Sequence, residues 1–310
     1  MRKSISISDA VLGFAVADAL GVPVEGWRRE ELKKTPVTSM QGYGTYDVPP
    51  GSWSDDTSMV VATMEALMEG LDYRRIMDAF CHWRMHGAYT PFGETFDCGI
   101  TVNTALYRYR QEGLAPTECG ADDGDSIGNG SLMRILPLVL YAQRKAMDLD
   151  AEMTLIAEGS ALTHAHPRAI LACKLYTVVL SCLRCHPGRR GVRRGLKRAA
   201  SLFEHEAEIF HFRRILSGSL HRVPESEIES GGYVVHTLEA ALWCVLTSKS
   251  YEQTVLKAVN LGRDTDTVAA VAGSIAGILY GQRGIPADWL ATLLRREYLE
   301  DLCRRAEDAW

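Results

Sequence analysis

Two pairs of aspartates each stand directly before an apolar segment with helical spacing. Asp55 and Asp56 occur in GSWSDDTSMV, and Asp264 and Asp266 occur in NLGRDTDTVAAVAG. One carboxylate near a helix N-terminus is explained by capping, which stabilises a helix by about 0.5–2 kcal/mol relative to alanine. A second carboxylate one or two positions away adds repulsion and little further capping. The second acid of each pair therefore requires another explanation.

A shared metal site would explain the doubled acids, because divalent cations neutralise carboxylates that otherwise repel one another. The two strings offer only hard oxygen ligands, which select Mg²⁺, Mn²⁺ or Ca²⁺ over Zn²⁺ or Cu²⁺. The residues concerned are Ser54, Asp55, Asp56, Thr57, Asp264, Thr265, Asp266 and Thr267. More than two hundred residues separate the strings, so the residues alone leave open whether they meet or cap two unrelated helices.

Helical spacing dominates the elements that must position these acids. Apolar residues after Asp56 recur at one face of a helix, as they do in 268–279. Further helices are expected within 132–141, 153–162, 169–183, 238–246 and 251–259. Only 233–238 looks β-like. The pattern predicts an all-α protein with roughly a dozen helices.

Three stretches rich in turn-forming residues separate the helical segments: 36–54, 113–130 and 217–233. None has the composition of a disordered linker. We therefore expect a single domain over 1–310 rather than two.

Bulk composition narrows the possible partners. The chain has 310 residues and a net charge of −5, which argues against nucleic acid as the main partner. We find no apolar run of about 20 residues, and 268–280 appears as the longest candidate. Asp9 and Asp18 interrupt the N-terminal apolar stretch, so no signal peptide is expected. These features predict a cytoplasmic protein without a membrane partner.

Two local motifs have simpler explanations than function. Cys182, Cys185 and His186 spell CxxCH, the string of haem c attachment, but attachment requires export and a zinc site requires a second ligand pair. The end of a helix explains them better. The basic run 189–198 is interpreted as a solvated helix start after the Pro187-Gly188 turn, in preference to a site for an anionic partner.

The order of several motifs resembles the ADP-ribosylglycohydrolase family, whose members remove ADP-ribose from proteins and include dinitrogenase reductase-activating glycohydrolases and ADP-ribosylhydrolases. WSDDTSM and GRDTDTVAAVAG are joined in family order by GFAVADALGVPVEGW, FDCGIT, GNGSLMRILPL and LTHAHP. The resemblance runs from about residue 8 to residue 285. It implies a compact single-domain orthogonal helical bundle with two Mg²⁺ ions in a cleft, with Mn²⁺ as a possible substitute.

The resemblance also implies which residues hold the metals. The implied ligands are Ser54, Asp55, Asp56, Asp264, Asp266 and Thr267. Ser54 stands where the family usually has Thr and keeps the hydroxyl. Arg263 stands where many members have Gly, and we expect it to place a cation at the edge of the cleft.

Catalytic and substrate-binding roles are carried over in the same way. Glu25, Asp56 and Asp97 are the implied proton-transfer or substrate-activating residues; without the resemblance, Glu25 would read as a surface glutamate. GNGSLMR suggests a phosphate cradle, in which glycines and a helix start approach an anion. The implied ADP-ribose site comprises Ser126, Asn129, Gly130, Ser131, Met133 and His164.

The expected reaction is Mg²⁺-dependent release of ADP-ribose, most simply from ADP-ribosyl-arginine on protein. Serine-linked, nucleic-acid-linked and small-molecule ADP-ribosides are alternative substrates. Two other classes stay open: a metal-dependent hydrolase of small nucleotides or phosphoesters, and a non-catalytic ADP-ribose-binding relative. A non-catalytic relative would be expected to have lost ligands, and all six are present here.

Overall fold

The computed structural model describes residues 5–310 and confirms the all-α prediction. Within these residues fifteen α-helices occur and no β-strand, apart from two isolated backbone bridges. The α-helices span Ile7–Gly21 (α1), Arg29–Lys34 (α2), Asp55–Leu67 (α3), Tyr73–His86 (α4), Ile100–Tyr107 (α5), Leu136–Arg144 (α6), Leu149–Ala161 (α7), Pro167–Leu183 (α8), Arg189–Leu202 (α9), Arg213–Leu216 (α10), Val234–Thr247 (α11), Tyr251–Val259 (α12), Thr265–Tyr280 (α13), Ala287–Thr292 (α14) and Arg296–Ala309 (α15).

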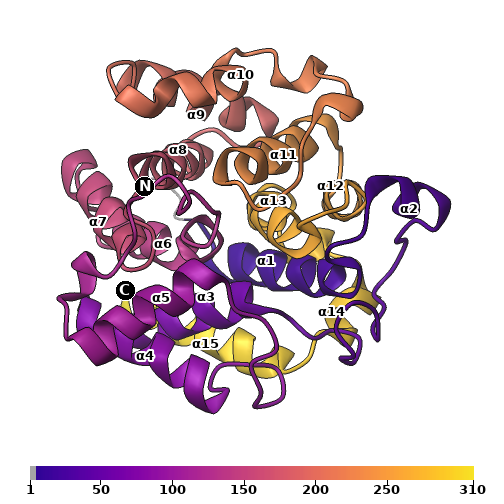
Figure 1. Cartoon of the computed structure of the whole chain (residues 1–310). Coiled ribbons are helices and arrows are strands. Elements are labelled where there is room, and N and C mark those ends of the chain that lie inside the picture. The colour runs from indigo at the N-terminus through magenta and orange to yellow at the C-terminus, as the bar shows by residue number, and fades with distance from the viewer. Residues whose placement is uncertain (1–4) are drawn as a thin grey trace.

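Helices α1 and α13 pack against each other in the middle of the molecule (Figure 1). Their backbones approach closely because small residues face each other. A Cβ added at Gly13 would lie 2.6 Å from the Gly273 carbonyl oxygen and 2.9 Å from Gly277 Cα. Both helices are apolar and almost entirely buried, so they show no amphipathic face. This pair forms the centre of the hydrophobic core.

The α1–α13 contact also fixes the start of α13, where one acid pair lies. A Cβ at Gly21, the last residue of α1, would lie 2.4 Å from Asp266 Cα. The Thr265 hydroxyl donates to the Gly21 carbonyl oxygen at 2.7 Å. The chain after α1 returns to the same place, because Gly26 N–H donates to the Arg263 carbonyl oxygen at 2.7 Å. The turn that carries Glu25 is thereby held beside the acids of α13.

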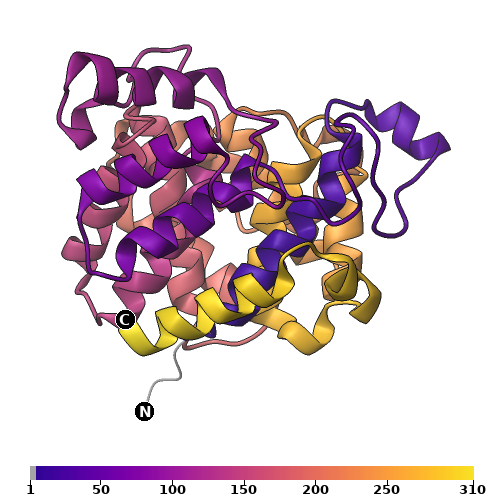
Figure 2. The ribbon, with the colours of Figure 1, turned by 90° about the horizontal axis from the view of Figure 1, so that it is seen from below.

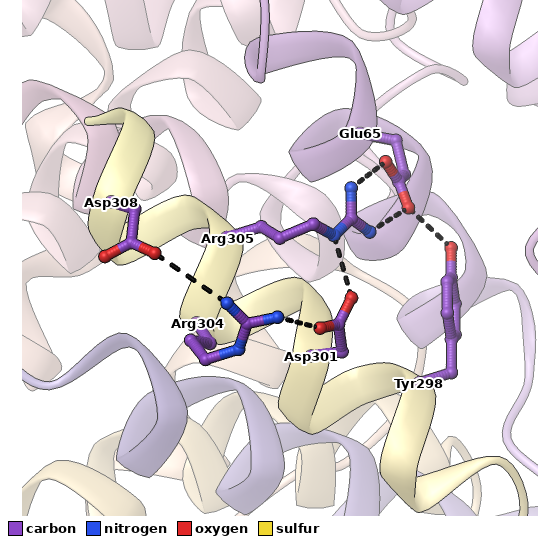
Figure 3. A network of polar contacts seen from close by, with 6 residues as sticks. All are labelled: Glu65, Tyr298, Asp301, Arg304, Arg305 and Asp308. Atoms are coloured by element: carbon purple, nitrogen blue, oxygen red, sulfur yellow. Dashed lines mark hydrogen bonds and ion pairs between the residues drawn. The ribbon is translucent and has the colours of Figure 1, made fainter.

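Helix α3, which carries the other acid pair, is held at its far end by α15, which runs alongside α1 and α3 (Figure 2). Arg305 donates to both carboxylate oxygens of Glu65, at 2.7 and 3.0 Å. The Tyr298 hydroxyl donates to the same carboxylate at 2.9 Å (Figure 3). Asp301 accepts a bond from Arg305 in turn. This network fixes the direction from which α3 enters the site.

Most predicted helices are present, and the differences have local causes. The segment 132–141 is interrupted: a 3₁₀ turn covers Leu132–Arg134 and α6 begins at Leu136, where Pro137 suits the first helical turn. The β-like interpretation of 233–238 is wrong, because α11 begins at Val234. Nearly every residue of α11 is buried, and a helix buried all round leaves no period of 3.6 in its sequence.

The apolar N-terminal stretch is longer than the sequence analysis recognised. The window Ile7–Val24, of 18 residues, is apolar and long enough to cross a membrane by length and composition, although Asp9 and Asp18 lie within it. However, 89% of this window is buried inside the protein. It is the central helix of the core described above.

The two local motifs have the simple structures expected of them. Cys182 lies in the last turn of α8, which ends at Leu183, and Cys185 and His186 follow shortly after the helix. All eight cysteines carry free thiols. The basic run 189–198 forms the first part of α9, after Gly188 in a left-handed conformation with φ of 80°.

Candidate active site

The two acidic strings meet, as the shared-site hypothesis requires. Asp55 and Asp56 lie in the first turn of α3, and Asp266 lies in the first turn of α13. The Thr267 hydroxyl donates to Asp56 Oδ1 at 3.3 Å, across 211 residues of sequence. The packing of α1 against α13 and the anchoring of α3 bring these helix starts together.

Capping does not account for either acid pair. The cap of α3 is Ser54, whose hydroxyl accepts the Asp56 N–H at 3.2 Å. Asp264 occupies the cap position of α13 but makes no capping bond with its side chain. Its carboxylate instead accepts a bond from the Asn129 amide at 2.7 Å. Ser54 therefore fills the capping role in α3 and Asp264 leaves it unfilled in α13, where Asp266 accepts only the adjacent Thr267 N–H at 2.9 Å.

A cavity of about 240 Å³ lies between these helix starts and the 128–133 loop. Eleven of the predicted site residues line it. They are Glu25, Asp55, Asp56, Asp97, Asn129, Gly130, Met133, His164, Asp264, Asp266 and Thr267. The cavity continues along residues 99–102 at the start of α5, which the sequence analysis did not include.

Three predicted residues do not line the cavity. Ser54 caps α3, as described. Ser126 donates to Asp123 Oδ1 at 3.1 Å, and Ser131 is fully buried behind the loop, where it accepts from Ser160 at 2.9 Å. Ser126 and Ser131 therefore do not contribute to the lining of the cavity.

The cavity concentrates negative charge away from water. Burial, together with the neighbouring carboxylates, raises the pKa values of Asp55, Asp56 and Asp266 well above their usual range. Burial and the charge of Asp97 raise the pKa of Glu25 to about 7. No lysine or arginine occurs among the described residues that line the cavity. The acids therefore lack a protein counter-ion at the place where they are most desolvated.

The carboxylate oxygens fit a divalent cation by number, type and lack of partners. Glu25, Asp97 and Asp266 each offer one oxygen within 4.8 Å of the others. Glu25 Oε2 and Asp56 Oδ2 are buried and have no hydrogen-bond partner, although buried polar atoms are normally satisfied. All the candidate metal-ligating atoms are oxygens, which suit Mg²⁺ or Mn²⁺.

Asp18 is a supporting residue that the sequence analysis did not identify. It lies in α1, is fully buried, and accepts bonds from the backbone N–H groups of Ser54 at 3.1 Å and Thr57 at 3.0 Å. Burial raises its pKa to about 6, against these hydrogen bonds. Asp18 thereby holds the start of α3 from outside the helix. An aspartate inside the apolar run GFAVADALG was the signal that could have revealed it.

An aromatic cluster adjoins the acids at the side of Glu25 and Asp97. Interaction with the Tyr46 hydroxyl lowers the pKa values of both carboxylates, although burial, the larger effect, raises them. Its ring lies 5.0 Å from that of Phe96, which stacks on Phe92 at 5.8 Å. From the sequence, the turn-rich stretch 36–54, which contains Tyr46, was singled out, but none of these aromatic side chains was.

The 128–133 loop is only partly available as a phosphate cradle. The Asn129 N–H donates to the Gly232 carbonyl oxygen at 3.0 Å, so it is already used. The turn after the loop is a 3₁₀ turn of three residues, Leu132–Arg134, rather than the α-helix start that the prediction assumed. Gly130 has a different reason to be glycine, because a Cβ there would lie 2.7 Å from His164 Cε1.

Arg263 does not line the cavity, contrary to its expected place at the cleft edge, and it is exposed. Its φ is 69°, in the left-handed region that favours glycine. Backbone conformation therefore explains why glycine suits this position.

Comparison with known proteins points to one family. The family model for ADP-ribosylglycohydrolase matches residues 5–310. The chain is 31% identical over 303 residues to ADP-ribosylarginine hydrolase Tri1 of Serratia proteamaculans (strain 568), covering 96% of this chain and 77% of that one. It is 31% identical to the ADP-ribosyl-[dinitrogen reductase] glycohydrolase of Rhodospirillum rubrum, covering 97% and 93%. A solved ADP-ribosylglycohydrolase-related protein complex aligns with a TM-score of 0.80 and 31% identity over 98% of both chains.

Proposed function

The chain belongs to the ADP-ribosylglycohydrolase family, and we propose that it releases ADP-ribose from modified arginine side chains of proteins at a pair of divalent metal ions. Hydrolysis of an ADP-ribosyl bond is the activity of the family and of its named relatives. The metal ions and the arginine linkage are the proposal. It rests mainly on one observation: two remote acidic strings share a cavity in which carboxylate oxygens lack partners.

The proposed metal ligands are the side chains of the two strings. They are Asp55, Asp56, Asp264, Asp266 and Thr267, which line the cavity; Ser54, which the resemblance also implied, caps α3 and does not line it. Two Mg²⁺ ions suit this oxygen set, and Mn²⁺ is the closest substitute. When bound, such ions supply positive charge that offsets the carboxylates and polarises ribose or water oxygens.

In the proposed reaction, the oxygen of a water molecule bonds to the anomeric carbon of the distal ribose as the bond from that carbon to the acceptor nitrogen breaks. Glu25 and Asp97 lie side by side at the cavity, and Glu25 Oε2 has no partner. We assign to this pair the proton that the water loses and the proton that the leaving guanidine gains. Asp56 holds the start of α3 against α13 through Thr267.

The ADP-ribosyl group is proposed to extend from the acids towards the 128–133 loop. Gly130, Met133 and His164 line that end of the cavity. Asn129 links the two ends, because its amide donates to Asp264 at 2.7 Å and to the Thr237 hydroxyl at 2.9 Å. We propose that Asn129 holds the loop in a fixed position relative to the acids.

The aromatic cluster favours arginine over serine as the acceptor. Tyr46 and Phe96 lie beside two carboxylates, and a planar guanidinium is attracted both to aromatic faces and to carboxylates. A neutral serine hydroxyl gains little from either. The Serratia and Rhodospirillum relatives are named for ADP-ribosylarginine and ADP-ribosyl-dinitrogen reductase, respectively.

A release assay on arginine-, serine- and DNA-linked ADP-ribose tests the acceptor directly. We expect release from the arginine-linked substrate and at least about tenfold less from the others. Product analysis with nucleoside diphosphate sugars distinguishes a hydrolase of small nucleotides. Binding of ADP-ribose without turnover on any substrate would instead indicate a non-catalytic relative and overturn the proposal.

A further inference from the structure

Arg134 is a buried cation that the reaction outlined above does not use. It is fully buried in the 3₁₀ turn Leu132–Arg134, directly after the cavity loop. No carboxylate forms an ion pair with it among residues 5–310; its guanidinium lies 5.0 Å from the Phe80 ring centroid. Burial lowers its pKa only to about 10, so it remains protonated at neutral pH.

The charge of Arg134 is directed at the end of α7 and the turn that follows it. Arg134 Nη2 donates to the carbonyl oxygen of Gly159 at 3.0 Å and to that of Ser160 at 3.4 Å. These are late carbonyls of α7, where the helix dipole favours a cation. The same nitrogen donates to the Thr163 hydroxyl at 2.6 Å. A structural role in capping α7 would explain the carbonyl contacts but not the contact with Thr163.

The contact with Thr163 determines the direction of the next hydrogen bond. Thr163 Oγ1 also lies 2.9 Å from His164 Nδ1, and Thr163 is fully buried. A guanidinium can only donate, whereas a hydroxyl has one proton to donate and two lone pairs. Arg134 occupies one lone pair of the oxygen, and His164 Nδ1 is the only other hydrogen-bond partner of this hydroxyl among residues 5–310. A proton on Nδ1 would leave the buried hydroxyl proton without an acceptor, so the hydroxyl donates to Nδ1. Nδ1 then accepts, and the proton of the neutral ring resides on Nε2.

The other side of the ring faces the cavity loop. A Cβ added at Gly130 would lie 3.1 Å from His164 Nε2, and one at Gly128 would lie 3.7 Å from it. Both glycines and His164 line the cavity. Burial, with the charge of Arg134, lowers the pKa of His164 to about 3, so the ring stays neutral at ordinary pH.

We infer that Arg134 and Thr163 are positioning residues that hold His164 in the tautomer protonated on Nε2, so that the ring donates a hydrogen bond to an oxygen of the ADP-ribosyl group. This rests on the proposed function, which places that group in the cavity. In the other tautomer, Nε2 would present a lone pair to the same oxygen and repel it. Arg134 itself does not touch the substrate.

The tautomer can be observed by ¹⁵N NMR of protein labelled in its nine histidine rings, with the His164 signals assigned from a His164→Gln variant. We expect the wild type to show a protonated Nε2, an unprotonated Nδ1 and no titration between pH 5 and pH 8. A wild-type ring protonated on Nδ1 overturns the inference. This readout does not depend on turnover, on metal or on substrate.

Variants of Thr163 test the relay itself. Thr163→Val keeps the shape but removes the hydroxyl, so we expect a mixture of tautomers and about tenfold weaker binding of ADP-ribose by calorimetry. Thr163→Ser keeps the hydroxyl, so it should restore the single tautomer and the wild-type affinity for ADP-ribose. Thr177→Val is the matched control, because Thr177 is equally buried but bonds only a helix carbonyl.

The outcomes separate this inference from the proposed function. A Thr163→Val protein with the wild-type tautomer and wild-type affinity overturns the relay. If Thr163→Val does not fold, Thr163→Ala replaces it and the wild-type spectrum still decides the tautomer. A wild type with the expected tautomer but no affinity for ADP-ribose would contradict the proposed ligand while leaving the relay in place.

Discussion

Replacing Gly21 by alanine should damage the site without altering any residue that lines it. The added Cβ would lie 2.4 Å from Asp266 Cα and 2.5 Å from Asp266 N. Carbon atoms not bonded to each other approach to about 3.5–4.0 Å, so the start of α13 must retreat by roughly 1 Å. The atoms in the way belong to the backbone and cannot rotate aside.

The expected effects of Gly21→Ala follow from that displacement. Overpacking of a core contact costs about 1–3 kcal/mol of unfolding free energy. A misplacement of 1 Å in a catalytic group lowers the rate by about 10²-fold, which corresponds to about 2.7 kcal/mol in the activation barrier. We therefore expect a folded protein whose kcat for ADP-ribose release falls by about two orders of magnitude.

A second glycine in the same helix contact provides the control. A Cβ at Gly273 would lie 2.4 Å from the Gly13 carbonyl oxygen and from Ala17 Cβ, so it is equally crowded. It lies seven residues beyond Asp266, about 10 Å along α13. Urea unfolding should show similar destabilisation in both variants, whereas Gly273→Ala should keep kcat within about threefold of wild type. Equal loss of kcat in the two folded variants would refute the reasoning.

Three further changes test separate parts of the structure. Asp18→Asn removes an acceptor of N–H groups at the start of α3, so urea unfolding should show a loss of about 1–3 kcal/mol; unchanged stability would exclude the supporting role. Although burial opposes it, hydrogen bonds from Arg305 lower the pKa of Glu65. Glu65→Gln should therefore lower the free energy of unfolding by about 1 kcal/mol at pH 7. This difference between variant and wild type should disappear below about pH 4, and a difference that grows on acidification would contradict the lowered pKa. Gly130→Ala brings a Cβ within 2.7 Å of His164 Cε1, so calorimetry should show about tenfold weaker ADP-ribose binding, and wild-type affinity would count against the close packing there.

The sequence predicted the helical class well, because apolar residues recur at helical spacing in several segments, among them those that form α3, α12 and α13. It failed at the start of α11. Helix α11 begins with Val234 and Val235 and is buried on nearly all sides, so β-branched residues without helical periodicity resembled a strand. The apolar window of α1 was overlooked because Asp18 interrupts it in the sequence. In the structure this aspartate is buried within the core helix, where it supports the start of α3.

The composition of the site was predictable, but its assembly was not. Doubled acids at two helix starts pointed to a role other than capping, and capping is indeed done by Ser54 in α3. That Asp56 meets Thr267 depends on how α1 packs on α13, through backbone contacts of glycines that no local pattern reveals. The Tyr46 and Arg134 contacts also require the folded chain, because their partners are distant in sequence.

The central claim is that both acidic strings hold divalent cations on which ADP-ribose release depends. The most direct test titrates Mg²⁺ into chelator-treated protein and follows ADP-ribose release from an ADP-ribosyl-arginine substrate, with Asp56→Asn and Asp266→Asn measured alongside. The account predicts no release in EDTA, recovery with Mg²⁺ in the wild type, and at least about 10²-fold less release in either variant. Full release in EDTA, or a variant as active as wild type, would contradict it.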